Sequence, residues 1–296
     1  MSYEWTNVRA PKAAQLNAVE SAGSIAFAAG ARGLMMERSG TGEWRTLFET
    51  GPRGNGSNLL GCGMTTDDRR IWFTGAGGTF GYYDRRSEEV ENYATPYDLT
   101  DDLTSVSVSG PAGNETLHVT TDSGRVFRAS MDQNDLTVDG VAVPRDGATI
   151  NEVVRIEQDH YLADDAGYLH YSQNGKRWRS HRLAETSVVG VATAANGLCA
   201  VTDSHGVHVD ISVFGEEGRR KQFPPGISAP NDVSAGGRTF VVCGDSGGVS
   251  TMSNKDAPFT PQETGKDKSY RAVELMSDGT IIAVGAEGTI SEGRFQ

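Results

Sequence analysis

The chain has 296 residues, 37% of them hydrophobic, and no apolar run approaches the roughly 18 residues of a membrane-spanning helix. Asp and Glu outnumber Lys and Arg by 39 to 27, and the resulting net charge of −12 argues against nucleic-acid binding, which needs a basic surface. The three widely spaced cysteines exclude a disulfide framework and form no Cys-x-x-Cys zinc motif.

The amino terminus and the lysine content bear on where the protein works. No basic region followed by an apolar core opens the chain, so we expect no signal peptide, and we expect no membrane insertion. Only 6 of the 27 basic residues are lysine, and acid excess with scarce lysine is typical of extreme halophiles. At about 1 M salt a Debye length of about 3 Å would screen the surface charge. We therefore predict a halophilic protein, with an ordinary acidic cytosolic protein as the alternative.

A unit of about 42 residues recurs seven times along the chain. Its marker is an apolar pair at i and i+3, and the second members lie 43, 44, 47, 38, 42 and 40 residues apart. The pairs are Leu16/Val19, Leu59/Cys62, Leu103/Val106, Ile150/Val153, Val188/Val191, Pro230/Val233 and Tyr270/Val273. A glycine follows each pair 14 to 18 residues later, at Gly33, Gly78, Gly124, Gly167, Gly206, Gly248 and Gly288.

Short strand patterns lie between these markers. In chain order they read SIAFAAG, RRIWFTG, ETLHVTT, HYLADD, GLCAVTD, TFVVCGD and TIIAVGA. Each run is apolar and ends at a turn, where an acidic or small residue precedes a glycine that accepts a positive φ. Long amphipathic helical patterns are absent, so we predict an all-β repeat protein.

Four short strands in each repeat are typical of a β-propeller blade. We predict one domain over residues 1–296, with blades at approximately 16–48, 58–96, 103–144, 150–184, 187–226, 230–265 and 270–296. The chain ends 23 residues past Val273, whereas Trp44 in the first repeat lies 25 residues past Val19. The seventh blade therefore lacks its outer strand. We expect residues 3–9, which contain Trp5, to supply that strand and to close the ring.

Two turn sequences carry a family resemblance. SQNGKRW, from Ser172 to Trp178, resembles the Asp-box Ser-x-Asp-x-Gly-x-x-Trp of bacterial-neuraminidase-repeat propellers, with Asn174 in place of the Asp and one residue fewer. RSGTGEW, from Arg38 to Trp44, is a weaker version, and the A-x-x-G turns resemble propellers of the photosystem-assembly-factor type. The whole chain is similar to haloarchaeal neuraminidase-repeat and WD-repeat-like proteins. The resemblance implies a β-propeller but no particular activity, because this fold serves many functions.

The turns between the second and third strands should share one face of the ring with the connections between blades. The charged residues at these turns are our candidate binding site: Arg32, Asp122, Asp164, Asp165, Asp203, Asp245 and Glu287. One interpretation is an acidic rim that binds a cation such as Ca²⁺ or a basic partner. The other is that the Asp side chains only cap turns. The capping interpretation is favoured because no loop shows dense, alternating oxygen ligands. We expect no metal and no cofactor.

The histidines do not predict a metal site either. His205 and His208 are three residues apart at the start of a strand, where i and i+3 point to opposite faces. The others are scattered: His118, His160, His170 and His181.

A glycoside hydrolase is the enzymatic alternative. Sialidase-type chemistry needs an arginine cluster, a tyrosine nucleophile and a carboxylate acid/base. The residue types are present in Arg32, Arg125, Arg155, Tyr168 and Asp165, but their spacing does not reproduce the family pattern. We therefore predict no catalytic residues and no enzymatic activity.

The leading functional hypothesis is a structural or recognition module of a larger assembly. Its most concrete form is a virion component of a haloarchaeal tailed virus, such as a capsid decoration, turret or tail-fibre protein. The expected partners are other subunits and a host-surface glycan or glycoprotein. A cytoplasmic scaffold or assembly factor is the second hypothesis, and a sialidase-like hydrolase the third. Thr50–Asn58 and Ser130–Gly140 are the expected contact loops, because long loops often carry recognition.

Overall fold

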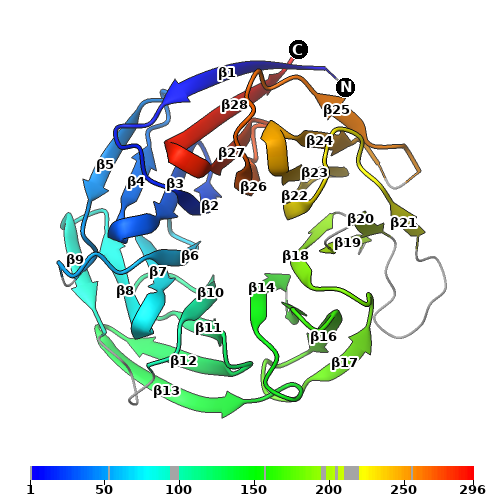
Figure 1. The fold of residues 1–296 in the computed structure, drawn as a ribbon. Helices are drawn as coiled ribbons and strands as arrows, with labels where there is room; N and C mark the ends of the chain where they lie inside the picture. Colours follow the sequence, from blue (N-terminus) through cyan, green and yellow to red (C-terminus); the bar gives the residue numbers. More distant parts are fainter. Residues whose placement is uncertain are drawn as a thin grey trace.

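The chain folds into a ring of blades around a central channel (Figure 1). The computed structural model describes residues 2–52, 54–93, 100–156, 158–194, 198–203, 206–209, 220–254 and 256–296. These residues form seven four-stranded antiparallel sheets, and the predicted seven-bladed β-propeller is confirmed. Among them, no helix is both long enough and apolar enough to cross a membrane.

Each blade runs from an inner strand at the channel to an outer strand at the rim. Blades one to three contain β2 (Leu16–Ala22), β3 (Ile25–Gly30), β4 (Met35–Arg38), β5 (Trp44–Phe48); β6 (Leu59–Met64), β7 (Arg70–Gly75), β8 (Thr79–Asp84), β9 (Glu89–Asn92); β10 (Leu103–Ser109), β11 (Thr116–Thr121), β12 (Val126–Asp132) and β13 (Asp135–Ala142). Blades four to six contain β14 (Ile150–Ile156), β15 (Asp159–Asp164), β16 (Tyr168–Ser172), β17 (Arg179–Arg182); β18 (Val188–Ala194), β19 (Leu198–Asp203), β20 (Gly206–Val209), β21 (Arg220–Gln222); β22 (Pro230–Gly236), β23 (Thr239–Gly244), β24 (Val249–Met252) and β25 (Thr260–Gln262). Blade seven contains β26 (Tyr270–Leu275), β27 (Ile281–Gly285), β28 (Thr289–Phe295) and β1 (Tyr3–Arg9).

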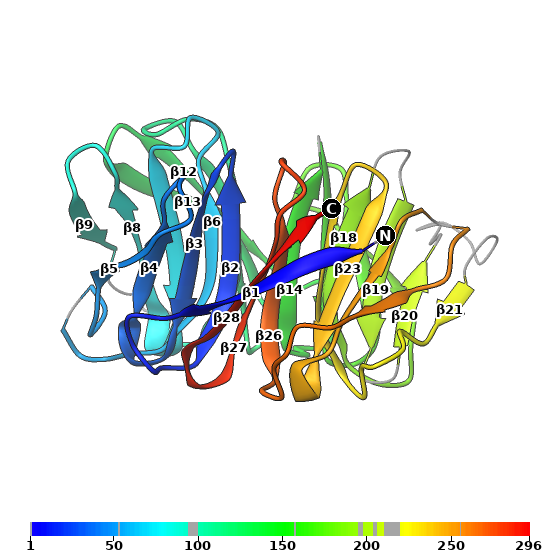
Figure 2. The ribbon, with the colours of Figure 1, turned by 90° about the horizontal axis from the view of Figure 1, so that it is seen from above.

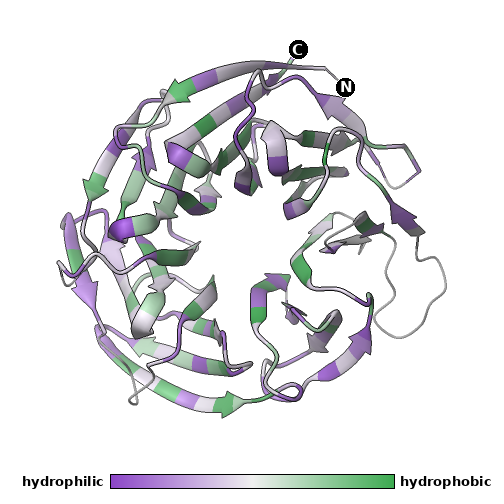
Figure 3. Cartoon of the chain, viewed as in Figure 1, coloured by the Kyte–Doolittle hydropathy of each residue, from purple (hydrophilic) through white to green (hydrophobic). Residues whose placement is uncertain are grey.

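The core consists of apolar clusters between neighbouring blades. In the described part of the chain there is one cluster at each of the seven blade interfaces. One of the largest clusters lies between blades two and three. There the ring centroids of Trp72 and Phe80 are 5.1 Å apart, and Phe127 packs against Phe80. Each such ring contributes about 1.5–3 kcal/mol by burial. Figure 3 accordingly shows green segments within the blades and much purple on the outer strands and turns.

A β-bulge recurs at the start of every inner strand. The register skips the second residue, as between Leu16 and Ala18, and the same shift occurs in all seven blades. Where the skipped residue is asparagine, its side chain bonds the next blade. Asn17, Asn151 and Asn231 each donate to the carbonyl of the first inner-strand residue of the following blade, at 2.7–2.8 Å. The repeated bulge thus becomes a polar contact between blades.

Four blades need a glycine where the second strand enters its turn. A Cβ atom at Gly30, Gly75, Gly244 or Gly285 would lie only 2.1–2.2 Å from the carbonyl oxygen of the connection that enters the same blade. The turn therefore packs directly on that connection, and only glycine allows the approach. This contact fixes the height of the turns on their face of the ring.

The amino-terminal strand closes the ring, as predicted. β1 pairs with β28 over seven residues, from Tyr3 opposite Phe295 to Arg9 opposite Thr289. Figures 1 and 2 show β1 running along the outside of β28, so both termini lie at the outer edge of one blade. Trp5 lies over Gly293, where an added Cβ would come within 2.9 Å of the indole ring.

A buried ion pair also spans the closure. The guanidinium of Arg38 in blade one donates two hydrogen bonds, of 2.9 and 2.8 Å, to the carboxylate of Glu292 in blade seven. Trp44 Nε1 donates a third bond of 2.9 Å to the same carboxylate. The side chains of Arg38 and Glu292 are only 4% and 6% exposed, so each charge depends on the other.

The structure corrects one expectation about the loops. Ser130–Gly140 was expected to be a long excursion, but it forms the end of β12, a tight turn at Gln133 and Asn134, and most of β13. The residues of this segment pair with one another across the hairpin. The segment therefore lengthens the outer strand of blade three and forms no long loop. Thr50–Asn58 is a connection between blades, and residue 53 lies outside the described part of the chain.

We expect that deleting residues 1–9 will expose the edge of β28 and remove the contacts of Trp5. The truncated chain should lose thermal stability and associate through the open edge. Thermal unfolding and light scattering after size-exclusion chromatography measure both effects. A truncated chain that stays monomeric with an unchanged melting temperature would contradict this role of β1.

We expect Glu292→Gln to lower the free energy of unfolding by about 3–5 kcal/mol, because the Arg38 charge stays buried without a carboxylate. The matched control is Glu49→Gln, since Glu49 pairs with Lys12 where both side chains are about half exposed, at 52% and 51%. That change should cost less than about 1 kcal/mol. Urea unfolding of both variants makes the comparison, and equal losses would refute the importance of the buried pair.

Candidate functional site

The turns between second and third strands lie on the face that also carries the connections between blades; we call it the turn face. Four of these turns are 3₁₀ segments: η1 (Ala31–Gly33), η2 (Ala76–Gly78), η4 (Asp245–Gly247) and η5 (Ala286–Gly288). In six blades the first turn residue donates its N–H to the connection entering that blade, at 2.7–3.2 Å. These hydrogen bonds fix the six described turns against the connections between blades.

Three of the four 3₁₀ turns place a side chain in a strained backbone conformation. Arg32, Ser246 and Glu287 have φ of 60°, 58° and 56°, the left-handed region, where the second turn has Gly77. For a non-glycine residue this conformation costs about 1–2 kcal/mol. All three residues are exposed, so the fold holds strained side chains at fixed positions facing solvent.

The structure places two of the predicted site residues differently from the expectation. Asp164 and Asp203 are 1% exposed and are not available to a partner on the turn face. Asp164 Oδ1 accepts the backbone N–H of Tyr168 at 2.7 Å, which is the capping of a turn favoured from the sequence. Each of the two aspartates accepts a hydrogen bond from a histidine on the third strand of its own blade, at 3.0 Å: His170 for Asp164 and His208 for Asp203. These carboxylates tie strands together inside blades four and five. A buried Asp–His pair needs two strands in register, which the spacing of the sequence alone did not reveal.

The other predicted residues do lie on the turn face, but they do not form one cluster. Asp122 and Asp165 are exposed at the first position of their turns, and half-buried Asp245 accepts a 3.1 Å bond from Asn231. Burial and the neighbouring carboxylates Asp102 and Asp101 raise the pKa of Asp122. Among the described residues, no group of three His, Cys, Asp or Glu side chains has the geometry of a metal site. A binding role for these residues stays a prediction.

The residues named for sialidase chemistry are not brought together. Arg155 is at the far end of β14, at the opposite face from the turn-face residues Arg32, Arg125 and Asp165. Tyr168 is covered by Arg145, whose guanidinium carbon lies 3.6 Å from the ring centroid. A nucleophile, an acid/base and an arginine cluster would have to converge within one pocket, and these residues do not.

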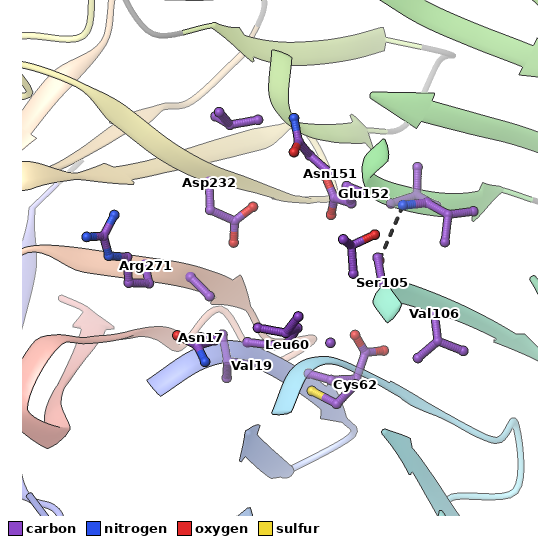
Figure 4. Close-up of a pocket in the computed structure, with 18 of the residues that line it drawn as sticks. Asn17, Val19, Leu60, Cys62, Ser105, Val106, Asn151, Glu152, Asp232 and Arg271 are labelled. Carbon is purple, nitrogen blue, oxygen red and sulfur yellow. Dashed lines mark hydrogen bonds between the residues drawn. The ribbon is translucent and has the colours of Figure 1, made fainter. Parts of the chain in front are cut away.

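A set of carboxylates in the central channel was not predicted from the sequence. Glu20, Glu152, Asp232 and Glu274, from the inner strands of four blades, line two connected stretches of the channel with volumes of about 260 and 210 Å³. Figure 4 shows Asp232, Glu152 and Ser105 around the open centre, with Cys62 opposite. The sequence does carry a signal for this set, because all four acidic residues occupy the third or fifth position of the repeated inner strand.

Hydrogen bonds hold these carboxylates in place. Asp232 accepts bonds of 2.8 Å from the backbone N–H of Val233 and from that of Val273 in the next blade. Glu274 accepts bonds from the hydroxyls of Ser21 and Ser234, at 2.6 and 3.0 Å. The carboxylates therefore link neighbouring inner strands, and their first role is structural.

Desolvation raises the pKa of every carboxyl group in this set. The pKa of Asp232 rises to about 7, chiefly because of burial. Burial also raises the pKa of Glu20, with Glu274 adding repulsion, and the pKa of Glu152, with Asp232 adding repulsion. The channel therefore takes up protons at a pH where ordinary carboxyl groups are ionised.

Two histidines described as scattered come together across an interface. His118 of blade three and His160 of blade four have ring centroids 4.2 Å apart. His205 lies outside the described residues, so the expectation that it shares no metal ion with His208 stays a prediction. Only the pairing of two blades creates the His118–His160 contact.

The turn face also carries exposed apolar side chains, which composition did not indicate. Val143, in the connection after blade three, is 58% exposed, and Phe223, in the connection after blade five, is 68% exposed. Lys221 Nζ lies 5.6 Å from the centroid of the Phe223 ring. The two side chains follow different blades, and single exposed apolar side chains of this kind are common on protein surfaces.

The solved structures similar to this chain are β-propellers with different tasks. A catalytically inactive virginiamycin B lyase from Staphylococcus aureus with quinupristin superposes with a TM-score of 0.82 at 11% identity, covering 100% of both chains. YCF48 bound to a D1 peptide gives 0.78 at 10% identity, covering 100% of this chain and 99% of that one. A chain of the mitotic checkpoint complex gives 0.78 at 12% identity, with coverage of 99% and 92%. No protein-family model and no curated protein sequence matches. At these identities the likeness establishes the fold alone, and both an enzyme and partner-binding proteins share it.

We expect the raised channel pKa values to make the protein less stable as pH rises from 6 to 8. A carboxyl group whose pKa is higher in the folded state binds more protons there than in the unfolded chain. Its contribution is present below the ordinary pKa near 4 and is lost as pH rises through the raised value, about 7 for Asp232. Glu274→Gln should weaken this decline, because an amide can still bond Ser21 and Ser234 and its neutral form removes repulsion on Asp232.

Melting temperatures between pH 6 and 8 test this expectation, since ordinary carboxyl groups stay ionised over that range. Glu287→Gln on the turn face is the control, and it should follow the wild type. An identical pH profile for wild type and Glu274→Gln would show that the channel carboxyls do not titrate in this window.

Proposed function

We propose that the protein is a non-enzymatic recognition module that binds a protein partner through its turn face. The observation that carries this proposal is the strained, exposed set Arg32, Ser246 and Glu287, held on turns that are hydrogen-bonded to the connections between blades, where glycine would be less costly. Exposed Val143 and Phe223 on the same face add apolar contact area. Two similar structures, YCF48 with its D1 peptide and the checkpoint complex chain, are in complexes with proteins or peptides, which agrees with this use of the fold.

The absence of an assembled sialidase constellation supports the non-enzymatic part of the proposal. Arg155 is on the opposite face from Arg32 and Arg125, and Asp164 and Asp203 are engaged with histidines. The channel carboxylates Glu152, Asp232 and Glu274 accept hydrogen bonds from neighbouring blades. The lyases among the similar structures keep enzymatic function open for this fold, so a screen against synthetic glycosides belongs beside the binding experiments.

Two finer forms of the proposal differ in the partner. In one, the protein is a halophilic virion component that contacts other particle subunits and a host-surface glycan or glycoprotein. In the other, it is a cytoplasmic scaffold that assists assembly of a complex. The composition, acidic and poor in lysine, supports the halophilic setting, and the similar structures do not favour the virion form. Mass spectrometry of purified virus particles and of host cytosol separates the two.

We expect Phe223→Ser and Arg32→Glu to reduce recovery of the cross-linked partner by at least about fivefold, since both side chains are exposed on the turn face. Phe295→Ser is the matched control, because Phe295 is 60% exposed but lies at the end of β28 on the opposite face. Cross-linking in native cells followed by quantitative mass spectrometry measures recovery. Unchanged recovery for both turn-face variants, or an equal loss for Phe295→Ser, would refute binding through the turn face.

A further inference from the structure

The interface between blades three and four has a small apolar core, close in size to that between blades four and five, whose cluster has five buried members. The apolar cluster between blades three and four has four buried members, Val126, Ile150, Val153 and Leu162, with Trp178 packed beside them. The clusters between blades two and three and between blades seven and one have ten buried members each. Those two interfaces are apolar. At the blade-three/four interface, polar side chains lie at the end opposite the turn face. A departure of this kind from good packing is expected at functional sites.

A cleft of about 380 Å³ opens at this end of the interface; we call it the blade-three/four cleft. Arg128 reaches it from β12, Arg155 from β14, and Lys176 from the turn after β16. The amides of Gln158 and Gln173 line it as well. No Asp or Glu is among the described residues that line the cleft. In a chain with net charge −12, three cations line one cavity, and the nearby carboxylates Asp139 and Asp159 lie outside its lining, so the lining itself is positive.

These cations are available to a ligand. Within the described part of the chain, neither Arg155 nor Lys176 has a carboxylate within 4 Å, and the nearest carboxylate of Arg128 is Asp139, with Nε and Oδ2 3.8 Å apart. Such a contact is at the outer limit of an ion pair. An arginine side chain carries donors in a planar fork that matches the oxygens of phosphate or carboxylate.

Two buried histidines form the floor of the cleft. His118 is 2% exposed and His160 is 5% exposed. Both ring nitrogens of His118, and Nδ1 of His160, have no hydrogen-bond partner among the described residues. Burial, the neighbouring His160 and the two arginines lower the pKa of His118 to about 3, and burial lowers the pKa of His160. Both imidazoles are therefore neutral at physiological pH. His118 keeps one N–H donor and one acceptor nitrogen, whereas His160 also has a hydrogen bond with the backbone of Ser172 and keeps only Nδ1 without a partner.

The Asp-box-like turn builds one wall of the cleft. Asn174 Oδ1 accepts the backbone N–H groups of Lys176 and Arg177 at 3.0 and 3.2 Å, which fixes the turn that presents Lys176. Gly175 packs so closely on His118 that an added Cβ would lie 1.9 Å from Nε2. The family motif has an aspartate at the position of Asn174. An amide makes the same bonds to the turn without adding a negative charge to the cleft.

We propose that the blade-three/four cleft binds a phosphate group carried by a small molecule. Donors from three elements surround the cavity, and a tetrahedral oxyanion directs oxygens toward several sides, whereas a single carboxylate is satisfied by one arginine in one plane. The volume exceeds that of a phosphate group, so the rest of a small ligand also fits. The cleft lies away from the turn face, and this inference does not depend on the proposed partner-binding function.

Titration calorimetry of the full chain with inorganic phosphate at pH 7.5 and constant ionic strength tests the proposal. We expect saturable binding with a Kd on the order of 1 mM or tighter. Arg155→Gln should weaken binding about tenfold or more, and Lys176→Gln about fivefold, because each removes a charge-assisted contact. Lys176 is exposed, so its substitution should leave folding intact even if Arg155→Gln does not.

Asn174→Asp is the sharpest variant, because the carboxylate can accept the same turn hydrogen bonds while repelling an anion. We expect about tenfold weaker phosphate binding with an unchanged melting temperature. The matched control is Asn254→Asp in the corresponding turn of blade six, where Asn254 Oδ1 accepts the N–H of Asp256 at 2.9 Å outside the cleft. No saturable phosphate binding, equal affinities for the Asn174→Asp and Asn254→Asp variants, or binding of citrate but not phosphate would each overturn the proposal.

Discussion

The structure depends on the burial of every blade between two neighbours. A single four-stranded sheet has two faces to cover, and in this ring each face is covered only by the next blade, through the clusters between blades. A ring left open would expose a sheet edge and two apolar faces. The pairing of β1 with β28 removes the open edge, and the Arg38–Glu292 pair with Trp44 adds a polar contact between the first and last blades.

The same requirement determines what lies in the channel. The inner strands converge on the axis of the ring. Their polar backbone and side-chain groups therefore need hydrogen-bond partners from the neighbouring blades. The bulge in each inner strand releases one residue from the ladder, and asparagines at that position bond the next blade. Glu152, Asp232 and Glu274 serve the neighbouring strands in a similar way. Their raised pKa values follow from placing acids where water is scarce.

The proposed sites lie where the ring departs from its repeat in side chain or in packing. On the turn face, Arg32, Ser246 and Glu287 occupy the backbone conformation that Gly77 adopts without cost in the corresponding turn of blade two. On the opposite face the deviation is a blade interface with few apolar contacts and a cleft lined by cations. The similar structures include a lyase and partner-bound propellers, so the fold by itself indicates neither an enzyme nor a binding protein.

The all-β class, the seven repeats and the closure by residues 3–9 were predictable from the residues alone, because they follow from local periodicity and from a seventh repeat that lacks one strand. The sequence also located exposed turn residues such as Asp122 and Asp165. Three features emerge only in the folded ring: Asp164 and Asp203 are buried beside histidines, Ser130–Gly140 is a strand pair, and His118 contacts His160. Repeats reveal what each blade does alone. Contacts between blades, such as that of His118 with His160, join residues about 40 positions apart or more. The Asp–His pairs and the Ser130–Gly140 hairpin lie within single blades, where the contact depends on strand register and burial that no local pattern encodes.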